Sequence, residues 1–287
     1  MTGTLHPGFG LWLFAVSLGA SALGGVLGMA GGIFIVPVLT IFGGMNIHTA
    51  VAASLVSVIG ASCGSVAPFL QARLTNIRLA ITLETATTLG ALSGVFLAGL
   101  FPVPFLFFLF AAILLLSAQQ MLAHRREPVT ATVDGGGWGT TLQLHATYPA
   151  GDSGEIAYRV ERVPLGLALM YGAGLISALL GIGSGVLKIP AMDTALRLPL
   201  KVSSATSNFM IGVTAAASAG AYFVRGDIVP SIAGPVALGS MVGAVLGVRM
   251  LMRVSSDKLR IFFVIVLLIL AVQMAFTAFG FNLGSHG

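Results

Sequence analysis

Two clusters of small residues, each closed by a proline, are the stretches best suited to bind a ligand: Gly28-Met-Ala-Gly-Gly-Ile-Phe-Ile-Val-Pro37 and Gly181-Ile-Gly-Ser-Gly-Val-Leu-Lys-Ile-Pro190. Glycines that interrupt a helix create a new helix N-terminus, which carries roughly half a positive charge and free backbone N–H groups. Two such ends facing one cavity can bind an anion without any charged side chain. The alternative is that these glycines only allow helices to pack closely. We predict an anion site with backbone contacts near Gly31–Gly32 and Ser184–Gly185.

Lys188 is the charged residue within the second cluster, and it occupies the position where the first cluster has Ile35. Burying an ammonium group in hydrocarbon costs at least about 2.5–3.5 kcal/mol, so the side chain must face a cavity or a partner. We predict that Lys188 supplies positive charge for an anionic substrate. The alternatives are a pair with Asp193, or a side chain that extends to the cytoplasmic face.

Hydroxyl and amide side chains follow each cluster at a similar distance along the chain. Ser54 and Ser57 follow the first cluster, and Thr206, Ser207 and Asn208 follow the second. Such groups suit the oxygens of a sulfonate or carboxylate, but they could equally join helices, at about 0.6 kcal/mol per hydrogen bond. We include Ser54, Ser57, Ser207 and Asn208 in the predicted substrate site.

Two carboxylates are candidates for coupling transport to an ion gradient. Glu84 lies one to two turns after Arg78, and Asp193 lies shortly after the second glycine cluster. Either could carry a proton, whereas a structural pair between Glu84 and Arg78 is the alternative for the first. Protons are therefore the predicted coupling ion.

The composition defines the class of protein. Of 287 residues, 56% are hydrophobic and only 8% are charged, whereas charged residues make up about a quarter of a soluble domain. The net charge of +5 comes from basic residues in short loops, which favours orientation in a lipid bilayer over nucleic-acid binding. The sequence therefore predicts an all-α polytopic membrane protein.

A membrane-spanning helix needs about 20 apolar residues. Eight stretches fit this length: 11–27, 49–70, 79–100, 104–123, 164–180, 202–224, 228–251 and 259–279. Two shorter apolar pieces, 32–42 and 185–196, follow the glycine clusters. Each is too short for a comfortable crossing, so each cluster is either a kink within one span or the turn of a hairpin.

The chain also repeats itself. A shift of 153 positions superposes seven small or proline residues of the first half on identical residues of the second, among them Gly28 on Gly181 and Pro37 on Pro190. Further along, we expect the shift to fall to 149, which pairs Gly90 with Gly239. Glycine-broken helices at matching places in two halves indicate the binding site of a transporter.

Basic residues distinguish the kink from the hairpin, because short cytoplasmic loops carry the excess of Lys and Arg. Eight simple spans would divide the loop charges almost evenly between the two sides. Hairpins would collect twelve of the 14 basic residues on one side, leaving only Arg225 opposite and Lys188 within the membrane. We therefore predict two inverted-topology repeats of about five membrane segments each, with eight simple spans as the alternative.

We expect the protein in the cell's inner (cytoplasmic) membrane. The topology divides the chain into membrane repeat 1 (1–123), a cytoplasmic linker (124–162) and membrane repeat 2 (163–287). Both termini are expected outside. The first span is expected to be retained rather than cleaved as a signal peptide, because no Lys or Arg precedes it. In the linker, 141–148 and 155–163 alternate apolar and polar residues around a Gly-containing turn, which predicts a β-hairpin; a disordered tether is the alternative.

Other chemistry finds no support in the sequence. The five histidines lack metal-ligand spacing and Cys63 has no second cysteine. No Gly-Lys-Ser/Thr phosphate loop is present, and no catalytic triad or carboxylate pair is visible within the spans. We predict neither an enzyme nor a bound cofactor or metal.

The doubled motif carries a family resemblance. The two glycine clusters with their prolines, and Ala-Thr-Ser-Asn at 205–208, resemble the sulfite exporter TauE/SafE family, also called the toluene-sulfonate uptake permeases. The resemblance covers about residues 10–123 and 163–280. The usual first motif is Gly-x-Gly-Gly-Gly, whereas this chain has Gly28-Met-Ala-Gly-Gly, and Ser184 stands where glycine is commoner. The linker departs from the compact family pattern.

The resemblance implies a permease for sulfite, sulfoacetate or other sulfonates, in either direction. We therefore expect a secondary active transporter that moves such an anion by alternating access, coupled to an ion such as the proton. The alternatives are an anion channel and a membrane component of a sulfur-relay system, for which Cys63 is the one available thiol. A homodimer is a further hypothesis.

Overall fold

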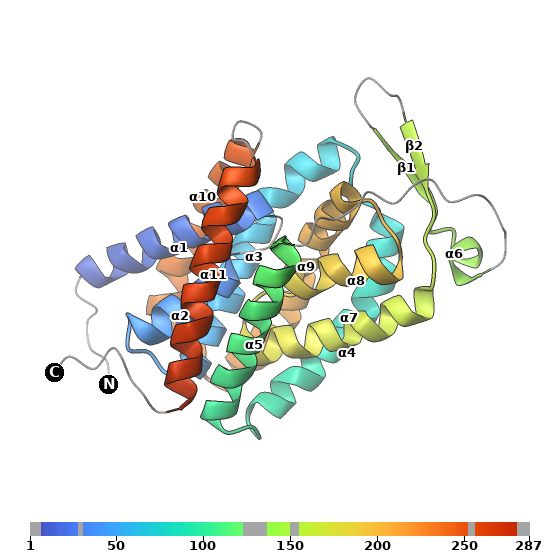
Figure 1. The fold of residues 1–287 in the computed structure, drawn as a ribbon. Helices are drawn as coiled ribbons and strands as arrows, with labels where there is room; N and C mark the ends of the chain where they lie inside the picture. The colour runs from blue at the N-terminus through green and yellow to red at the C-terminus, as the bar shows by residue number, and fades with distance from the viewer. Residues whose placement is uncertain (1–6, 28–30, 123–136, 150–154, 252–255, 280–287) are drawn as a thin grey trace.

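A computed structural model describes residues 7–27, 31–122, 137–149, 155–251 and 256–279. The described chain consists of eleven helices and one small sheet (Figure 1). Helices of the first half are α1 (Pro7–Leu27), α2 (Gly32–Ile41), α3 (Ile47–Gln71), α4 (Ile77–Ala98) and α5 (Val103–Leu122). Those of the second half are α7 (Val163–Leu180), α8 (Gly185–Ala195), α9 (Leu200–Val224), α10 (Pro230–Leu251) and α11 (Ser256–Ala278).

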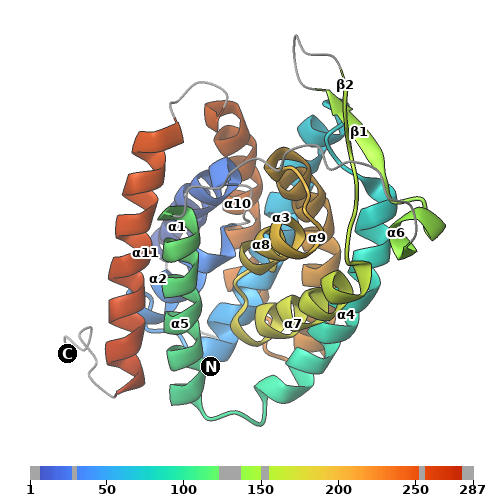
Figure 2. The ribbon, with the colours of Figure 1, turned by 45° about the vertical axis from the view of Figure 1, so that its right-hand side comes forward.

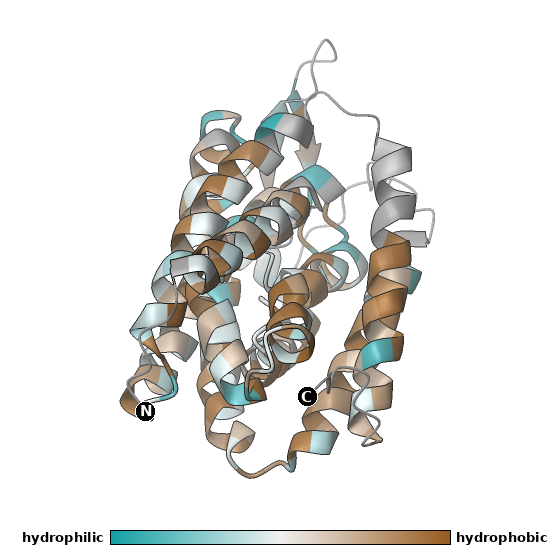
Figure 3. Ribbon diagram, turned by 90° about the vertical axis from the view of Figure 1, so that its left-hand side faces the viewer, coloured by the Kyte–Doolittle hydropathy of each residue, from teal (hydrophilic) through white to brown (hydrophobic). Residues whose placement is uncertain are grey.

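The helices are apolar on the outside as well as in the core. Phe96, Leu238 and Ile269 are more than half exposed, as are other large apolar side chains. Hydrophobic residues, coloured brown, are frequent along the helices in the view of Figure 3. The helices α3, α4, α7 and α10 each hold an apolar window of 18 residues, and further apolar stretches lie at 8–24, 103–119 and 264–278. A surface of this kind is stable against lipid rather than water. The prediction of an all-α polytopic membrane protein is confirmed, with the linker sheet as an addition.

The two halves match helix by helix at a constant shift of 153. The first and last residues of α9 follow those of α3 by 153 positions, and the same holds for α10 and α4. The first residue of α8 follows that of α2 by the same number. A Cβ on Gly90 would overlap the Tyr171 carbonyl, and one on Gly243 would overlap the Leu18 carbonyl, which are matching contacts at 153. The expected fall of the shift to 149 is therefore wrong, and Gly90 corresponds to Gly243 rather than Gly239.

The packing of helix pairs shows the same correspondence between the two halves. α1 packs along α10 as α7 packs along α4, α5 lies beside α11 (Figure 2), and α3 contacts α9 at the centre. Glycines allow the backbones of these pairs to approach closely. In the α4–α7 pair, Gly90 lies on Tyr171 and Gly94 on Leu175, so these two helices run parallel.

The directions of the other helices follow from similar contacts. α1 runs parallel to α10, because Gly239 lies on Phe14 and Gly243 on Leu18. Likewise, α3 runs parallel to α10 and α9 parallel to α4. The start of α3 and the end of α9 both lie at the end of α7, so α3 and α9 are antiparallel. The two five-helix sets therefore run in opposite directions.

Each short helix turns back along the helix before it. A Cβ on Gly31 would lie 2.7 Å from the Ala20 carbonyl, two turns before the end of α1. At the other end of α8, the Glu161 amide donates to the Leu196 carbonyl (3.3 Å), beside the start of α7. The chain thus forms hairpins, and the alternative of eight simple spans is wrong.

The linker contains the predicted β-hairpin, although it is shorter than expected. Strand β1 (Ala146–Pro149) pairs antiparallel with β2 (Glu155–Tyr158). Residues from 141 were expected in the first strand, but Trp138–Thr141 form the short helix α6. The hairpin is fixed to the helices by Asn76, whose Nδ2 donates to the Leu144 carbonyl and the Tyr158 hydroxyl, both at 2.9 Å.

The glycine contacts between α4 and α7 provide a test of this packing. We expect Gly90→Ala to lower the free energy of unfolding by about 1–3 kcal/mol, because the new methyl group overlaps the Tyr171 carbonyl. Thermal melting of the purified protein in detergent measures the effect. Gly172→Ala on the adjoining helix is the control, since nothing lies within 4 Å of its Cβ position. Equal melting temperatures for the two variants would contradict the close packing.

Candidate functional site

The second glycine cluster forms a tight connection between α7 and α8. Gly181 and Gly183 have φ angles of 65° and 71°, the left-handed conformation that favours glycine. The Gly181 amide donates to the Ser177 carbonyl (2.8 Å) and ends α7, and α8 begins at Gly185 with Ser184 before it. The residues of the cluster therefore determine locally where the helix breaks.

The first cluster breaks the chain at the matching place. α1 ends at Leu27 and α2 begins at Gly32, whereas Gly28–Ala30 lie outside the described residues. Both Gly31 and Gly32 are buried. A side chain at either position would collide with backbone, which explains the need for small residues there.

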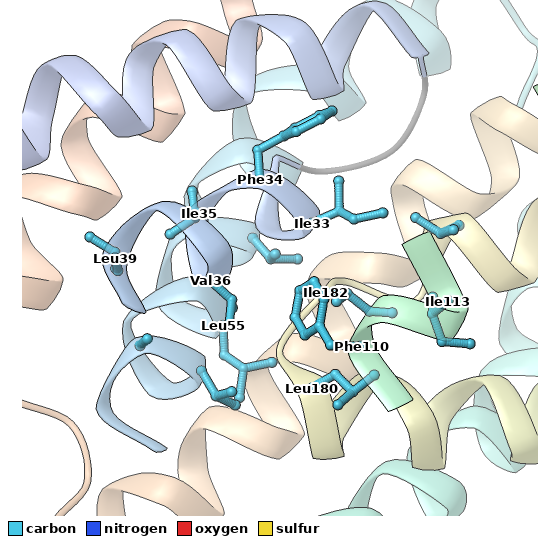
Figure 4. Packing of buried hydrophobic residues seen from close by; sticks show 14 of the residues in the cluster. Ile33, Phe34, Ile35, Val36, Leu39, Leu55, Phe110, Ile113, Leu180 and Ile182 are labelled. Atoms are coloured by element: carbon cyan, nitrogen blue, oxygen red, sulfur yellow. The ribbon is translucent and has the colours of Figure 1, made fainter. Parts of the chain in front are cut away.

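The two breaks touch. A Cβ on Gly32 would lie 2.8 Å from the Gly181 carbonyl oxygen, and Ile182 packs among residues of α2 and α5 (Figure 4). Ser54 joins both breaks to α3, because its hydroxyl donates to the Gly181 carbonyl (2.6 Å) and lies 3.3 Å from the Gly32 carbonyl. Segments 150 residues apart in sequence thus meet inside the molecule.

The polar residues predicted for the site separate into two groups. Some are already bonded within the protein: Ser57 to the Ser240 hydroxyl, and Asn208, whose Nδ2 donates to the Ser204 carbonyl. By contrast, the buried hydroxyls of Ser184 and Ser207 have no hydrogen-bond partner in the described part of the chain. An unpaired buried hydroxyl is costly, so among the predicted site residues Ser184 and Ser207 have hydroxyls available to a ligand, as do Ser21, Thr75 and Ser203 elsewhere in the described chain.

Ser207 belongs to the same place as Ser184 by the repeat relation. The shift of 153 maps Ser54 onto Ser207 and Gly32 onto Gly185. In the second half the corresponding hydrogen bond is not formed, because the Ser207 hydroxyl has no partner among the described residues, although α9 packs against α8. From the contact of Ser54 with Gly32 we expect Ser207 near the start of α8, where Ser184 also lies.

Lys188 is completely buried and forms an ion pair with Glu84. Its Nζ donates to Glu84 Oε2 (3.0 Å) and to Thr214 Oγ1 (2.7 Å), and Thr214 Oγ1 in turn donates to Glu84 Oε1 (2.5 Å). Thr88 Oγ1 donates to the same Glu84 Oε1 (3.2 Å). Residues from α4, α8 and α9 thus form one closed polar cluster.

The cluster lies well inside the helices. Glu84 is seven residues after the start of α4, which places it about 10 Å along that helix. Lys188 is one turn after Ser184, and its amide donates to the Ser184 carbonyl (2.8 Å). Lys188 and the unpaired hydroxyl of Ser184 thus belong to one face at the start of α8.

These contacts correct two alternatives from the sequence. Lys188 pairs with Glu84 from another helix rather than with Asp193, which is half-buried five residues further along α8 and so on another face. Glu84 pairs with Lys188 rather than with Arg78, whose guanidinium donates to the Gln143 side-chain oxygen (2.6 Å). The coupling candidate and the substrate-binding candidate are thus in direct contact, which the sequence analysis did not predict.

Thr214 is the member of the cluster that sequence reasoning missed. Its counterpart at a shift of 153 is Ala61, while Lys188 corresponds to Ile35 and Glu84 to Ala237. All three matching positions are apolar, and Ile35 is buried in the core cluster (Figure 4). The signal in the sequence was that polar residues of one half correspond to apolar residues of the other.

The ion pair gives a direct prediction of stability. Lys188→Met or Glu84→Gln alone leaves one charge buried without its partner, and we expect each to lower the free energy of unfolding by about 3–5 kcal/mol. The double variant removes both charges and should melt close to the wild type. Thermal melting in detergent of the four proteins measures the coupling. Additive losses in the double variant would show that the two side chains do not stabilise each other.

Within the described residues, no group of three His, Cys, Asp or Glu side chains could hold a metal ion. Cys63 is exposed on α3, away from the buried cluster. The site thus offers hydrogen-bond donors, a helix N-terminus and one ion pair. Such groups can bind an anion and exchange a proton.

Comparison with known proteins agrees with a role in transport. The family model "Sulfite exporter TauE/SafE" matches residues 13–274. The chain is 23% identical over 272 residues to "Probable membrane transporter protein YunE" of Bacillus subtilis (strain 168), covering 92% of this chain and 96% of that protein. No solved structure shows significant similarity to the chain. The chain therefore belongs to the TauE/SafE family of membrane transporters.

Proposed function

We propose that the protein is a secondary active transporter for a small sulfur-containing or organic anion, such as sulfite, sulfoacetate or another sulfonate. The observation that carries this proposal is the contact between the two glycine breaks beside the buried, unpaired hydroxyls of Ser184 and Ser207. The N-terminus of α8 adds partial positive charge at the same place. A small oxyanion supplies the acceptors that these donors lack.

The proposed site lies where two sets of helices of opposite direction meet. In the membrane these sets would form an inverted-topology repeat, and rocking of one against the other would expose the anion to each side in turn. Backbone near Gly31–Gly32 and Ser184–Gly185 would line the site, with Ser207 and Lys188 as side-chain donors. Ser54, Ser57 and Asn208 would then support the breaks and the helices around them.

The orientation follows from the distribution of basic residues. The linker hairpin, the start of α4 and the end of α8 lie at one end of the molecule, together with Arg73, Arg78, Arg159, Arg162, Arg197 and Lys201. Arg225 lies at the opposite end, where it donates to the Val95 carbonyl (2.9 Å). We propose that the end rich in basic residues faces the cytoplasm, with the termini outside the cytoplasmic membrane.

Flux into proteoliposomes with labelled sulfite and sulfoacetate tests the proposal. We expect Ser207→Ala and Ser184→Ala each to weaken apparent substrate affinity by about tenfold or more, because each removes a hydrogen bond to a charged group. Ser218→Ala is the control, since that buried hydroxyl on α9 donates within its own helix to the Thr214 carbonyl.

Two results would count against the proposal. Unchanged affinity in both variants would remove these hydroxyls from the site. A sulfite current across planar bilayers that needs no coupled ion gradient would identify an anion channel instead.

A further inference from the structure

We propose that Glu84 and the transported anion bind Lys188 in turn, so that protonation of Glu84 admits the anion. This inference rests on the proposed function and adds its coupling step. The Glu84 carboxylate takes up a proton from water and releases the Lys188 ammonium, which then pairs with the incoming anion. Release of the anion and loss of the proton restore the ion pair.

The charge balance of the site requires this exchange. Among the described residues, the buried Lys188 ammonium is neutralised by the Glu84 carboxylate in contact with it. A monovalent anion that joined the intact pair would leave a net negative charge inside the membrane, which is costly. An anion that enters together with a proton leaves the net charge at zero, before and after binding.

The anion would bind next to the lysine, at the start of α8. Ser184 and Lys188 are four residues apart at the start of α8 and so lie on one face of that helix. The hydroxyl of Ser184 is buried and unpaired among the described residues. A lysine has a flexible four-carbon stem, so its ammonium can move from Glu84 to an anion one turn away.

Thr214 is the positioning residue of the exchange. Its hydroxyl accepts from Lys188 and donates to Glu84, and it also lies 3.2 Å from the Met210 carbonyl. When Glu84 is protonated, its carboxylic acid O–H can donate to the Thr214 hydroxyl oxygen. This hydrogen bond replaces the one that the Lys188 ammonium donated to the same oxygen. Thr88 remains as a second partner of the same carboxyl oxygen.

Other ionisable groups around the cluster are engaged elsewhere. On α7 the one titratable side chain is Tyr171, whose hydroxyl donates to Ser93 (3.0 Å). On α9 the ionisable residues are Lys201 in the first turn, and Tyr222 in the last turn, whose hydroxyl donates to the Ala178 carbonyl (3.0 Å). On α4 Arg78 donates to Gln143, and on α8 Asp193 is half-buried away from the pair. Glu84 is thus the carboxylate that controls Lys188.

The repeat limits the device to one copy. The symmetry-related positions are Ile35 and Ala61 in the first half and Ala237 in the second, which carry neither charge nor hydroxyl. One ammonium and one carboxylate can exchange one proton for one anion. The inferred stoichiometry is therefore one proton per monovalent anion, moving in the same direction.

Binding of methanesulfonate, whose charge does not change between pH 5.5 and 8.5, tests the exchange in the purified full-length protein. We expect the wild-type Kd to rise up to about tenfold per pH unit over the upper part of this range, as linkage to one proton requires. Glu84→Gln mimics the protonated acid, and its Kd should be independent of pH. Lys188→Gln should abolish binding at every pH, and Asp193→Asn, the matched control, should keep the wild-type slope.

A second measurement needs no variant and covers the case in which Glu84→Gln does not fold. In weakly buffered solution near pH 7.5, the wild type should take up about one proton per methanesulfonate bound. No proton uptake, or a wild-type Kd independent of pH, would overturn the exchange while leaving anion transport intact. Failure of the wild type to bind methanesulfonate, sulfite or sulfoacetate at any pH would overturn the proposed function together with the exchange.

Discussion

The ion pair between Lys188 and Glu84 is the interaction on which the interior of this protein depends. The Lys188 ammonium lies among apolar helices, where it is tolerable only with a carboxylate in hydrogen-bonding contact. The pair connects α8, the short helix that follows a glycine break, to α4 and through Thr214 to α9. Any rearrangement of α8 must therefore break this pair or carry it along.

The repeat supplies the frame in which this pair stands. Five helices occur twice at a constant shift of 153, and the two sets run in opposite directions while their glycine breaks touch at Gly32 and Gly181. The symmetry-related positions of the polar cluster are Ile35 and Ala61 in the first half and Ala237 in the second, all apolar. The ion pair thus joins the two halves, since Lys188 lies on α8 and Glu84 on α4, and it has no symmetry-related copy.

The fold was predictable from the sequence to a large degree, the site only in part. Long apolar runs, glycine breaks and the distribution of Arg and Lys predicted the membrane class, the helices and the hairpins, because these follow from local composition and from burial in lipid. The predicted shift of 149 between α4 and α10 was wrong, since glycines spaced four residues apart, such as Gly239 and Gly243, fit either shift equally well. The helix ends and the contacts of Gly90 and Gly243 across the helix pairs distinguish them.

By itself, the sequence determined that Lys188 needed a partner, that the chain breaks at two glycine clusters, and that hydroxyl groups follow each break. The tertiary structure decided which partner that is: Glu84, 104 residues away on another helix, rather than the nearby Asp193. It also decided which hydroxyls are already bonded and which are not. The reason is physical, because burial cost depends on a residue's own type, whereas its compensation depends on which distant helices the packing brings together.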